Sequence, residues 1–178
     1  MDMEEKTLER ESVFEGKVIH VYRDTAQMPD GSKALRELVK HPGGVAIALE
    51  DEDGSFFMVK QWRYAQETVT LEFPAGKKEP GEDPLTTAKR EISEETGYTG
   101  KDWMYLGKIY PTPAYDSEVI DLYYAKKDQW VGTHFDDDEH LEPLKMTLDE
   151  LTDLALQGQL PDAKTVAIIF YMKEMRKK

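Results

Sequence analysis

The sequence contains no cysteine. It can therefore form neither disulfides nor thiolate sites, which is compatible with a reducing cytoplasm. It also lacks an apolar run of roughly 18 residues, so we expect no membrane-spanning helix and no membrane partner. Residues 1–16 are charged throughout, and this pattern does not match the basic and then apolar order of a secretory signal. We therefore expect a cytoplasmic protein.

Positive charge is scarce. The chain has 36 acidic and 23 basic residues, so its formal net charge is −13 at pH 7. This surplus of negative charge argues against nucleic acid as a partner. It would also repel a free anionic substrate, which would need metal cations and a few well-placed arginines in order to bind. The histidines show no paired spacing suited to zinc: His20, His41, His134 and His140.

What the chain does have is enough apolar material for a sizeable core in one domain of ordinary size. Its 178 residues are 39% hydrophobic and 10% aromatic. Apolar patterning and turn residues predict strands at 17–27, 33–41, 45–49, 56–62, 68–73, 103–110, 119–125 and 144–146. Helical patterns predict helices at 83–96, 148–157 and 163–177. Strands mixed with helices indicate an α+β or α/β fold.

Three details of this pattern are expectations about packing. The strands at 17–27 and 33–41 should form one antiparallel hairpin, and those at 45–49 and 56–62 another. The last helix should bury a stripe through Val166, Ile169 and Phe170. Trp62 and Tyr64 should share one strand face, either in the core or in a pocket wall.

The segment 76–98 is the most informative part of the chain and reads GKKEPGEDPLTTAKREISEETGY. Asp83 is a good N-cap, Pro84 suits the first helical position, and Gly97 suits the residue after the helix end. Within this helix Glu91 should lie beside both Glu94 and Glu95.

Like charges at this spacing repel by roughly 0.2–0.5 kcal/mol per pair. Such a group of carboxylates is tolerated best when a hard cation binds between them, and Mg²⁺ takes oxygen ligands of this kind. The alternative is a solvated acidic helix face. Arg90 should lie near Glu94, and near Glu82 if the preceding loop folds back; its alternative is a plain surface salt bridge with Glu94.

These residues carry a family resemblance. The segment resembles the full Nudix box at every fixed position: Gly76, Glu82, Arg90, Glu91, Ile92, Glu94, Glu95, Gly97 and the apolar Tyr98. The Nudix family hydrolyses nucleoside diphosphates linked to another group and uses divalent cations. The resemblance implies an α/β/α sandwich with a mixed sheet between helices.

The resemblance also implies a metal site. The backbone carbonyl of Ala75 with Glu91 and Glu95 would hold Mg²⁺, for which Mn²⁺ could substitute, and Glu94 would lie nearby. Glu82 would brace Arg90 more readily than it would bind the metal.

Other stretches are similar to ADP-ribose pyrophosphatases within that family. They include Arg36-Glu37, Val59 to Tyr64, Glu72 to Gly76, and Pro113 sixteen residues after Gly97. The resemblance implies that substrate contacts come from Arg36, Glu37, Arg63 and Glu118, and that Tyr22 and Ile19 are candidates to stack on adenine, with core packing as the alternative for both. Ala114-Tyr115 depart from the small residues usual after the marker proline.

The same resemblance implies a division of the chain into two parts and a second copy of the chain as its partner. Residues 1–42 would be an N-terminal β segment that exchanges between the subunits of a homodimer, and residues 43–178 the catalytic domain. The base that activates water would come from the acidic loop 132–143. Alignment places Asp137 and Glu139 on the two acidic positions of the family's loop. We favour Glu139, because Asp137 is shorter by one methylene than the expected glutamate.

The expected activity is hydrolysis of ADP-ribose to AMP and ribose 5-phosphate. Two alternatives stay open: an enzyme for another nucleotide sugar or a dinucleotide, and a non-catalytic module that senses ADP-ribose. A sensor would be expected to lose carboxylates of the box, and none is lost here.

Overall fold

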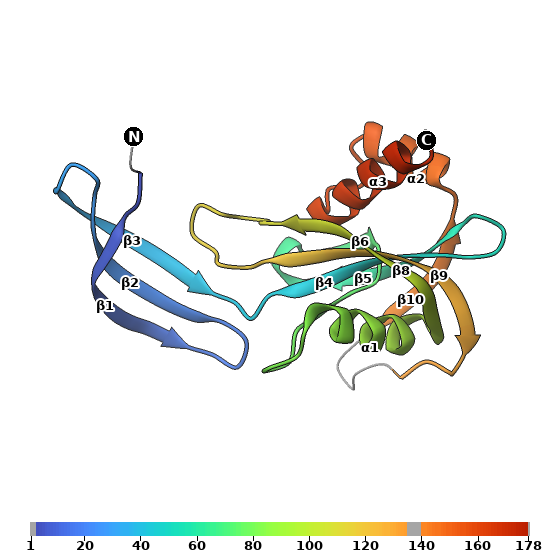
Figure 1. Ribbon diagram of the computed structural model, residues 1–178, viewed down its shortest axis with the longest axis horizontal. Coiled ribbons are helices and arrows are strands. Elements are labelled where there is room, and N and C mark those ends of the chain that lie inside the picture. Colours follow the sequence, from blue (N-terminus) through green and yellow to red (C-terminus); the bar gives the residue numbers. More distant parts are fainter. Residues whose placement is uncertain (1–2, 135–139, 178) are drawn as a thin grey trace. The chain divides into compact units, whose positions relative to one another are not determined.

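The computed structural model describes residues 3–134 and 140–177 and divides into two compact units (Figure 1). The first unit contains Met1–Gly43 and Tyr110–Val119, and the second contains Gly44–Ile109 and Ile120–Lys178. Among the described helices, none has the length and apolar character needed to cross a membrane.

The first unit is built on a three-stranded antiparallel sheet of β1 (Lys6–Glu15), β2 (His20–Gln27) and β3 (Lys33–Lys40). The hairpin expected from residues 17–27 and 33–41 is confirmed as β2 and β3. The sequence pattern missed β1, because every residue of this charged strand is exposed and no buried face imposes alternation.

Segment 110–119 joins this unit through backbone hydrogen bonds with β3. The Val39 N–H donates to the Tyr115 carbonyl at 2.7 Å, and the Ser117 N–H donates to the Val39 carbonyl at 2.9 Å. The segment that holds Pro113 and Glu118 is therefore fixed alongside the end of β3.

The second unit contains a seven-stranded mixed sheet, in which β10-β5-β4-β9-β8 form a continuous order, β6 pairs with β5, and β7 pairs with β4. The central pair β4–β9 is parallel. The strands are β4 (Gly44–Glu50), β5 (Phe56–Arg63), β6 (Thr68–Glu72), β7 (Ala75–Lys77), β8 (Tyr98–Ile109), β9 (Ile120–Trp130) and β10 (Leu141–Met146).

The expected hairpin of 45–49 with 56–62 was wrong in its extent. β4 and β5 are paired only at Glu50 and Phe56, next to the turn. Beyond that point β4 pairs with β7 and β9, whereas β5 pairs with β6 and β10. Because β5 is separated from β4 there, the first residues of β4 can pair with β7, which contains Ala75 and Gly76.

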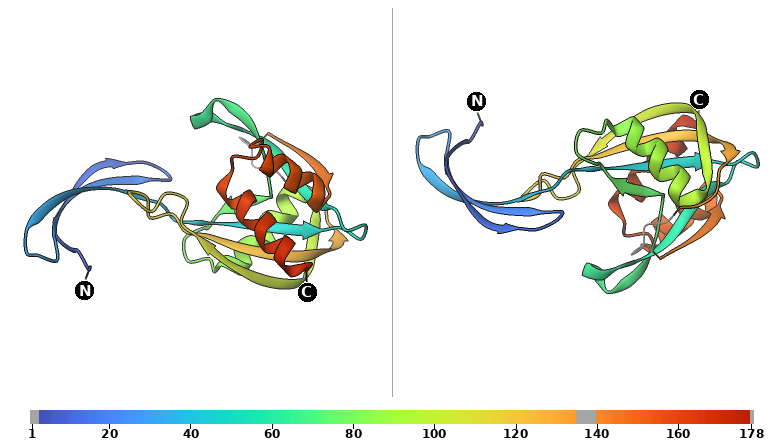
Figure 2. Two further views of the ribbon diagram at one scale, coloured as in Figure 1. Left: turned by 90° about the horizontal axis from the view of Figure 1, so that it is seen from above. Right: turned by 90° about the horizontal axis from the view of Figure 1, so that it is seen from below.

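Three helices cover the two faces of this sheet. Helix α1 (Pro84–Thr96) lies on one face, and α2 (Leu148–Leu156) and α3 (Ala163–Met175) lie on the other (Figures 1 and 2). Ala88 and Ile92 of α1 pack in one buried cluster, while α2 and α3 contribute to a second cluster around Phe56. The α/β/α sandwich expected from the sequence is confirmed.

The expected apolar stripe of α3 was partly wrong. Ile169 is buried, but Phe170 is 62% exposed and Val166 is 43% exposed. The buried face includes Lys164 and Thr165, because both side chains bond to the end of β6 and to the residue after it. A pattern that counts only apolar residues therefore misplaces the buried face.

Trp62 and Tyr64 also differ from expectation. Trp62 is 55% exposed, and Tyr64 is 87% exposed in the short 3-10 helix η1 (Tyr64–Gln66). Neither side chain belongs to the core.

Candidate active site

Helix α1 forms where the sequence predicts it and is closed at both ends. The Asp83 carboxylate accepts hydrogen bonds from the Leu85 and Thr86 N–H groups at 3.1 and 3.2 Å. Pro84 occupies the first turn, and Gly97 ends the helix with a φ of 75°. Ala88 and Ile92 are fully buried. The helix is therefore held firmly against the sheet.

Two carboxylates of α1 are buried along with this apolar stripe. Glu91 is 8% exposed and Glu95 is 2% exposed. The solvated acidic face is therefore wrong for these two residues. Removing carboxylates from water is costly unless cations or hydrogen-bond donors compensate. Burial at consecutive turns thus indicates a site whose charge must be balanced.

The position of Glu91 explains the glycine that precedes the loop. A Cβ built on Gly76 would lie 1.9 Å from the carboxyl carbon of Glu91, so this carboxylate rests against the backbone of β7. The Ala75 carbonyl belongs to the peptide group that enters Gly76. The Glu91 carboxylate and the backbone of Gly76 are thereby brought together.

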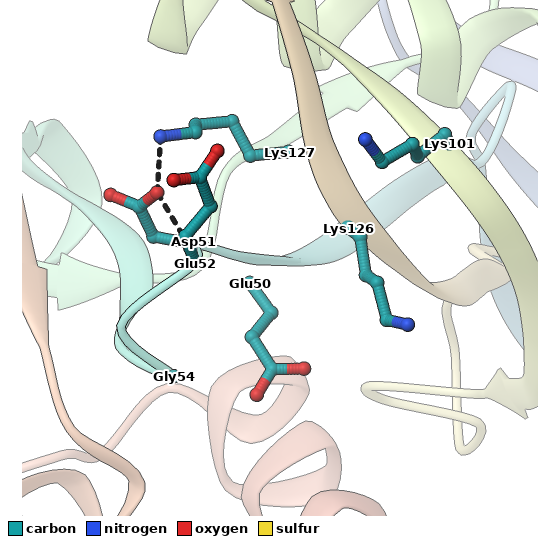
Figure 3. Close-up of a pocket in the computed structure, with 7 residues that line it drawn as sticks. All are labelled: Glu50, Asp51, Glu52, Gly54, Lys101, Lys126 and Lys127. Atoms are coloured by element: carbon teal, nitrogen blue, oxygen red, sulfur yellow. Dashed lines mark hydrogen bonds and ion pairs between the residues drawn. The ribbon is translucent and has the colours of Figure 1, made fainter.

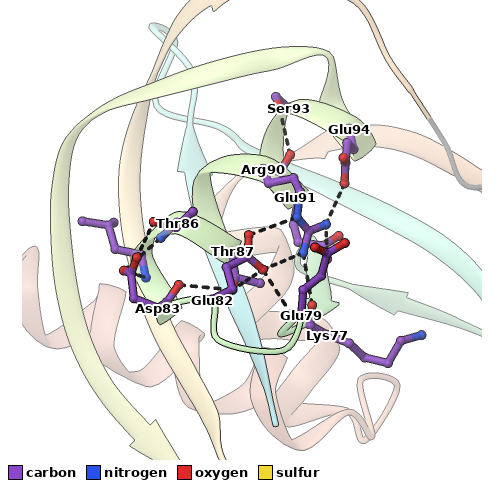
Figure 4. A network of polar contacts seen from close by, with 11 residues as sticks. Lys77, Glu79, Glu82, Asp83, Thr86, Thr87, Arg90, Glu91, Ser93 and Glu94 are labelled. Carbon is purple, nitrogen blue, oxygen red and sulfur yellow. Dashed lines mark hydrogen bonds and ion pairs between the residues drawn. The ribbon is translucent and has the colours of Figure 1, made fainter. Parts of the chain in front are cut away.

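Arg90 gathers the acidic side chains around this point (Figure 4). Its Nη1 donates to Glu91 at 2.8 Å and to Glu94 at 2.9 Å. Its Nε and Nη2 donate to Glu82 at 3.3 and 3.1 Å, and Nη2 also donates to the Lys77 carbonyl at 3.2 Å. Arg90 is therefore much more than a surface salt bridge with Glu94.

Glu82 is held by this network and by its own loop. It accepts hydrogen bonds from the Thr87 hydroxyl at 2.8 Å and from the Glu79 N–H at 3.2 Å. The hydrogen bonds from Arg90 outweigh desolvation and lower the pKa of Glu82 to about 2. In turn, the hydrogen bond to Glu82 raises the pKa of Arg90 above its ordinary value. The loop has folded back onto α1, which was the condition set by the sequence.

The donor set at α1 fits Mg²⁺. Within residues 3–134 and 140–177, no three His, Cys, Asp or Glu side chains are grouped as a complete metal cage. Mg²⁺ does not need one, because it commonly uses one or two carboxylates and completes its shell with water and substrate phosphates. Glu91, Glu95 and the Ala75 carbonyl provide oxygen atoms of the required kind.

Arg63, at the end of β5, is held by a buried acid that the sequence reasoning did not assign to the site. Its Nε and Nη2 donate to the two oxygens of Glu72 at 2.7 and 2.6 Å. Glu72 is 2% exposed and also accepts a hydrogen bond from Lys164. The hydrogen bond to Glu72 raises the pKa of Arg63, and the charge of Glu95 adds to this effect. Arg63 is therefore held by Glu72 and also feels the charge of Glu95.

The remaining expected substrate residues belong to the first unit. Arg36 forms a two-pronged ion pair with Glu5, at 2.8 Å for each bond. Glu37 is exposed on β3, and Ile19 is half-buried just before β2. The other two residues each lie near a basic residue: Glu118 Oε1 lies 3.4 Å from His41 Nδ1, and the Tyr22 ring lies 4.8 Å from the Arg10 guanidinium carbon.

The expected base residues, Asp137 and Glu139, lie outside the described residues. The chain just before them is attached to the end of α1. The His134 N–H donates to the Glu94 carbonyl at 3.0 Å, and the Val131 N–H donates to the Gly97 carbonyl at 2.8 Å. The acidic loop therefore begins beside the carboxyl end of α1.

A polar cavity of about 240 Å³ lies at the other end of β4 from the residues that pair with Gly76 (Figure 3). Lys127 forms an ion pair with Asp51 there, and Glu50 accepts a hydrogen bond from Tyr124. None of the expected site residues lines it: the lining is Glu50, Asp51, Glu52, Gly54, Lys101, Lys126 and Lys127.

The fold and the site together define a class. It is an α/β/α sandwich in which the helix after a glycine-containing loop carries carboxylates on its buried face. A NUDIX domain matches residues 40–167, and a nucleoside diphosphate sugar hydrolase N-terminal domain matches residues 5–39. The chain belongs to the Nudix family and is a Nudix hydrolase.

The chain is similar to two curated proteins over nearly its whole length. It is 38% identical over 173 residues to an ADP-ribose pyrophosphatase of Bacillus subtilis, covering 96% of this chain and 94% of that protein. It is 37% identical over 174 residues to a methanol dehydrogenase activator of Bacillus methanolicus, covering 96% and 93%. A crystal structure of an ADP compounds hydrolase matches with a TM-score of 0.85 at 22% identity, covering 99% of this chain and 97% of that one, which supports the fold.

Proposed function

We propose that this Nudix hydrolase cleaves the diphosphate bond of ADP-ribose and releases AMP and ribose 5-phosphate. The observation that carries the proposal is the buried pair Glu91 and Glu95 on α1, with Glu91 packed against the Gly76 backbone. The similarity over the full chain to an ADP-ribose pyrophosphatase supports the choice of substrate.

The divalent ion in this proposal is Mg²⁺, with Mn²⁺ as a substitute, held by Glu91, Glu95 and the Ala75 carbonyl. When bound, it would lower the pKa of a coordinated water and neutralise charge on the phosphate oxygens. Arg90 keeps Glu91 and Glu94 in place, and Glu82 braces Arg90.

Side chains named by the resemblance would bind the substrate. The Arg63 guanidinium offers paired donors that suit a diphosphate. In this proposal Arg36, Glu37 and Glu118 bind the sugar and phosphate groups, and Tyr22 and Ile19 lie against the adenine. A carboxylate of the acidic loop removes the proton from the attacking water; we assign this role to Glu139, with Asp137 as the alternative.

We also propose a homodimer that uses the first unit. Its strand β1 is exposed along its whole length, and exposed apolar side chains accompany it, including Leu8, Val13 and Phe14. Light scattering during size exclusion would test this proposal, and a monomer at micromolar concentration would contradict it.

A substrate panel tests the function. We expect the highest kcat/KM for ADP-ribose when it is compared with ADP-glucose, GDP-mannose and NADH in the presence of Mg²⁺. Glu95→Gln should lower turnover by a factor on the order of 10² or more and leave the fold intact. Glu174→Gln, an exposed acid on α3, serves as the matched control. Faster turnover of another diphosphate would replace ADP-ribose, and unchanged turnover in Glu95→Gln would remove this residue from the mechanism.

Hydrolysis of a different nucleotide sugar is the second candidate. The match of the N-terminal residues to a nucleoside diphosphate sugar hydrolase domain favours it, as does 28% identity over 148 residues to a GDP-mannose pyrophosphatase of Cronobacter sakazakii. The same panel separates the two candidates. A sensor without activity would bind ADP-ribose and release no product with Mg²⁺ present.

A further inference from the structure

A buried charge network joins the end of β6 to the start of α3. Glu72 accepts hydrogen bonds from the Arg63 guanidinium at 2.7 and 2.6 Å, from the Thr70 hydroxyl at 2.5 Å, and from Lys164. A carboxylate offers about four acceptor positions, so the acceptor capacity of Glu72 is filled. Its position is therefore set by β5, β6 and α3 together.

Lys164 is buried, and so is the acid that it contacts. Its side chain is 8% exposed, and it also donates to Asp162 at 2.9 Å. A lysine almost never occupies such a position unless it is paired, because burying an ammonium group is costly. An apolar side chain at position 164 would be enough to pack α3 against the sheet. The positive charge of Lys164 therefore requires a separate explanation.

Lys164 and Arg63 donate hydrogen bonds to the same oxygen of Glu72. Glu72 Oε2 accepts from Arg63 Nη2 and from Lys164 Nζ. Two cations thus share one carboxylate. If Lys164 were neutral, the negative charge of Glu72 would be balanced by Arg63 alone, and the guanidinium would attract a second anion less strongly.

Arg63 has donors left for such an anion. Glu72 uses its Nε and Nη2, and within the part of the chain that the structure describes its Nη1 donates no hydrogen bond. The guanidinium is also close enough to Glu95 for that charge to affect it. Arg63 is thereby coupled electrostatically both to the Glu72 network and to Glu95 of α1.

We infer that Lys164 is a positioning residue for substrate binding: by sharing Glu72 with Arg63, it leaves the Arg63 guanidinium available to the diphosphate. This inference rests on the proposed function only for the role of Arg63 as a diphosphate ligand. It adds α3, far from α1 in the sequence, to the machinery that binds the substrate.

The test compares Lys164→Met with Lys173→Met in the full chain. Lys173 is a partly exposed lysine on the same helix, with a side chain 41% exposed, so both variants lose one positive charge from α3. For Lys164→Met we expect KM for ADP-ribose to rise about tenfold and kcat to stay within about threefold, because a ground-state contact is weakened. The Kd for the non-hydrolysable α,β-methylene analogue should rise by the same factor. Lys173→Met should match the wild type.

A double-mutant cycle separates positioning from simple folding effects. If Lys164 acts through Glu72, then Lys164→Met should add little to KM in a Glu72→Gln background, so the two effects are not additive. Additive effects, or equal KM values for Lys164→Met and Lys173→Met, would overturn the inference. Lys164→Gln keeps a hydrogen-bond donor but loses the charge, so we expect the same rise in KM. This variant replaces Lys164→Met if the latter does not fold.

The substrate panel with the wild-type protein shows whether the proposed function fails, and it does so independently of the Lys164 variants. If another diphosphate proves to be the better substrate, the function changes, and the same variants are then measured on that diphosphate. The expected rise in KM is unchanged in that case, because the diphosphate group is common to both.

Discussion

The carboxylate of Glu91 fills the space that a side chain on residue 76 would need, and the clash distance to an added Cβ would be 1.9 Å. This relationship joins a strand and a helix that the loop separates in sequence. It also links Gly76, the first residue of segment 76–98, to the buried Glu91 through steric exclusion. Gly76 is therefore required by the packing of Glu91, and its backbone does not need a positive φ.

Gly76→Ala should separate activity from stability. The atoms that the new methyl group meets belong to the flexible end of Glu91, so the carboxylate can move away while the fold remains. We expect kcat/KM to fall by a factor on the order of 10², because Glu91, the proposed metal ligand, is displaced. The melting temperature should change by only a few degrees. Steady-state kinetics and a thermal melt provide the two measurements.

Gly81→Ala is the matched control in the same loop. No atom lies within 4 Å of an added Cβ there, but the residue has a φ of +81°. It should therefore cost about 1 kcal/mol of stability through backbone strain and leave kcat nearly unchanged. If Gly76→Ala kept full activity, Glu91 would not need its present position.

Arg90→Ala should leave three acids without their common cation. Glu82, Glu91 and Glu94 all accept hydrogen bonds from this guanidinium. We expect a loss of about 1–3 kcal/mol in the free energy of unfolding, given that the side chain is partly exposed. Added Mg²⁺ should restore more stability to this variant than to the wild type, since a second cation can offset the repulsion.

The measurement is chemical denaturation with and without Mg²⁺. Lys89→Ala removes an exposed positive charge from the same helix and should show neither effect. An Arg90→Ala variant as stable as Lys89→Ala would show that the network contributes no stability.

The sequence predicted those features that depend on neighbours along the chain. Helix α1 is one of them, because Asp83, Pro84 and Gly97 act within a turn of the residues that they affect. The contact of Arg90 with Glu82 could also be expected, since a single loop separates them. Strand β1 could not, because its residues have no buried face to impose a period.

Features that depend on contacts between distant segments could not be predicted from the sequence. The parallel pairing of β4 with β9 joins strands separated by β5 to β8 and α1. The ion pair of Glu72 with Lys164 joins residues 92 positions apart. Nothing in the local pattern distinguishes Lys164 from Lys173, the partly exposed lysine of the same helix, so the buried partner of Lys164 could be recognised only in the folded structure.

Metal removal should destabilise the protein as well as stop turnover. A ligand that binds only the folded state adds about 2.7 kcal/mol at a hundredfold excess over its Kd. We therefore expect the melting temperature to rise with Mg²⁺ in the wild type and to respond far less in a Glu91→Gln/Glu95→Gln variant. Chelation with EDTA should reverse the wild-type shift. Equal shifts in the two proteins would place the ion elsewhere.

Glu72 should make stability depend on pH in a defined window. Its hydrogen bonds with Arg63, together with the charge of Lys164, outweigh desolvation and lower its pKa from 4.5 to about 2. A carboxylate with a lowered pKa stabilises the folded state above its unfolded pKa, and that stabilisation is lost as the pH falls through the folded value. The contribution of Glu72 should thus be complete above about pH 4.5 and fade toward pH 2, by an amount on the order of 3 kcal/mol. Glu72→Gln should be less stable than the wild type at pH 7, and the two unfolding free energies should converge in acid. Urea denaturation at several pH values measures both curves, and parallel curves would show that this carboxylate does not titrate in the assigned way.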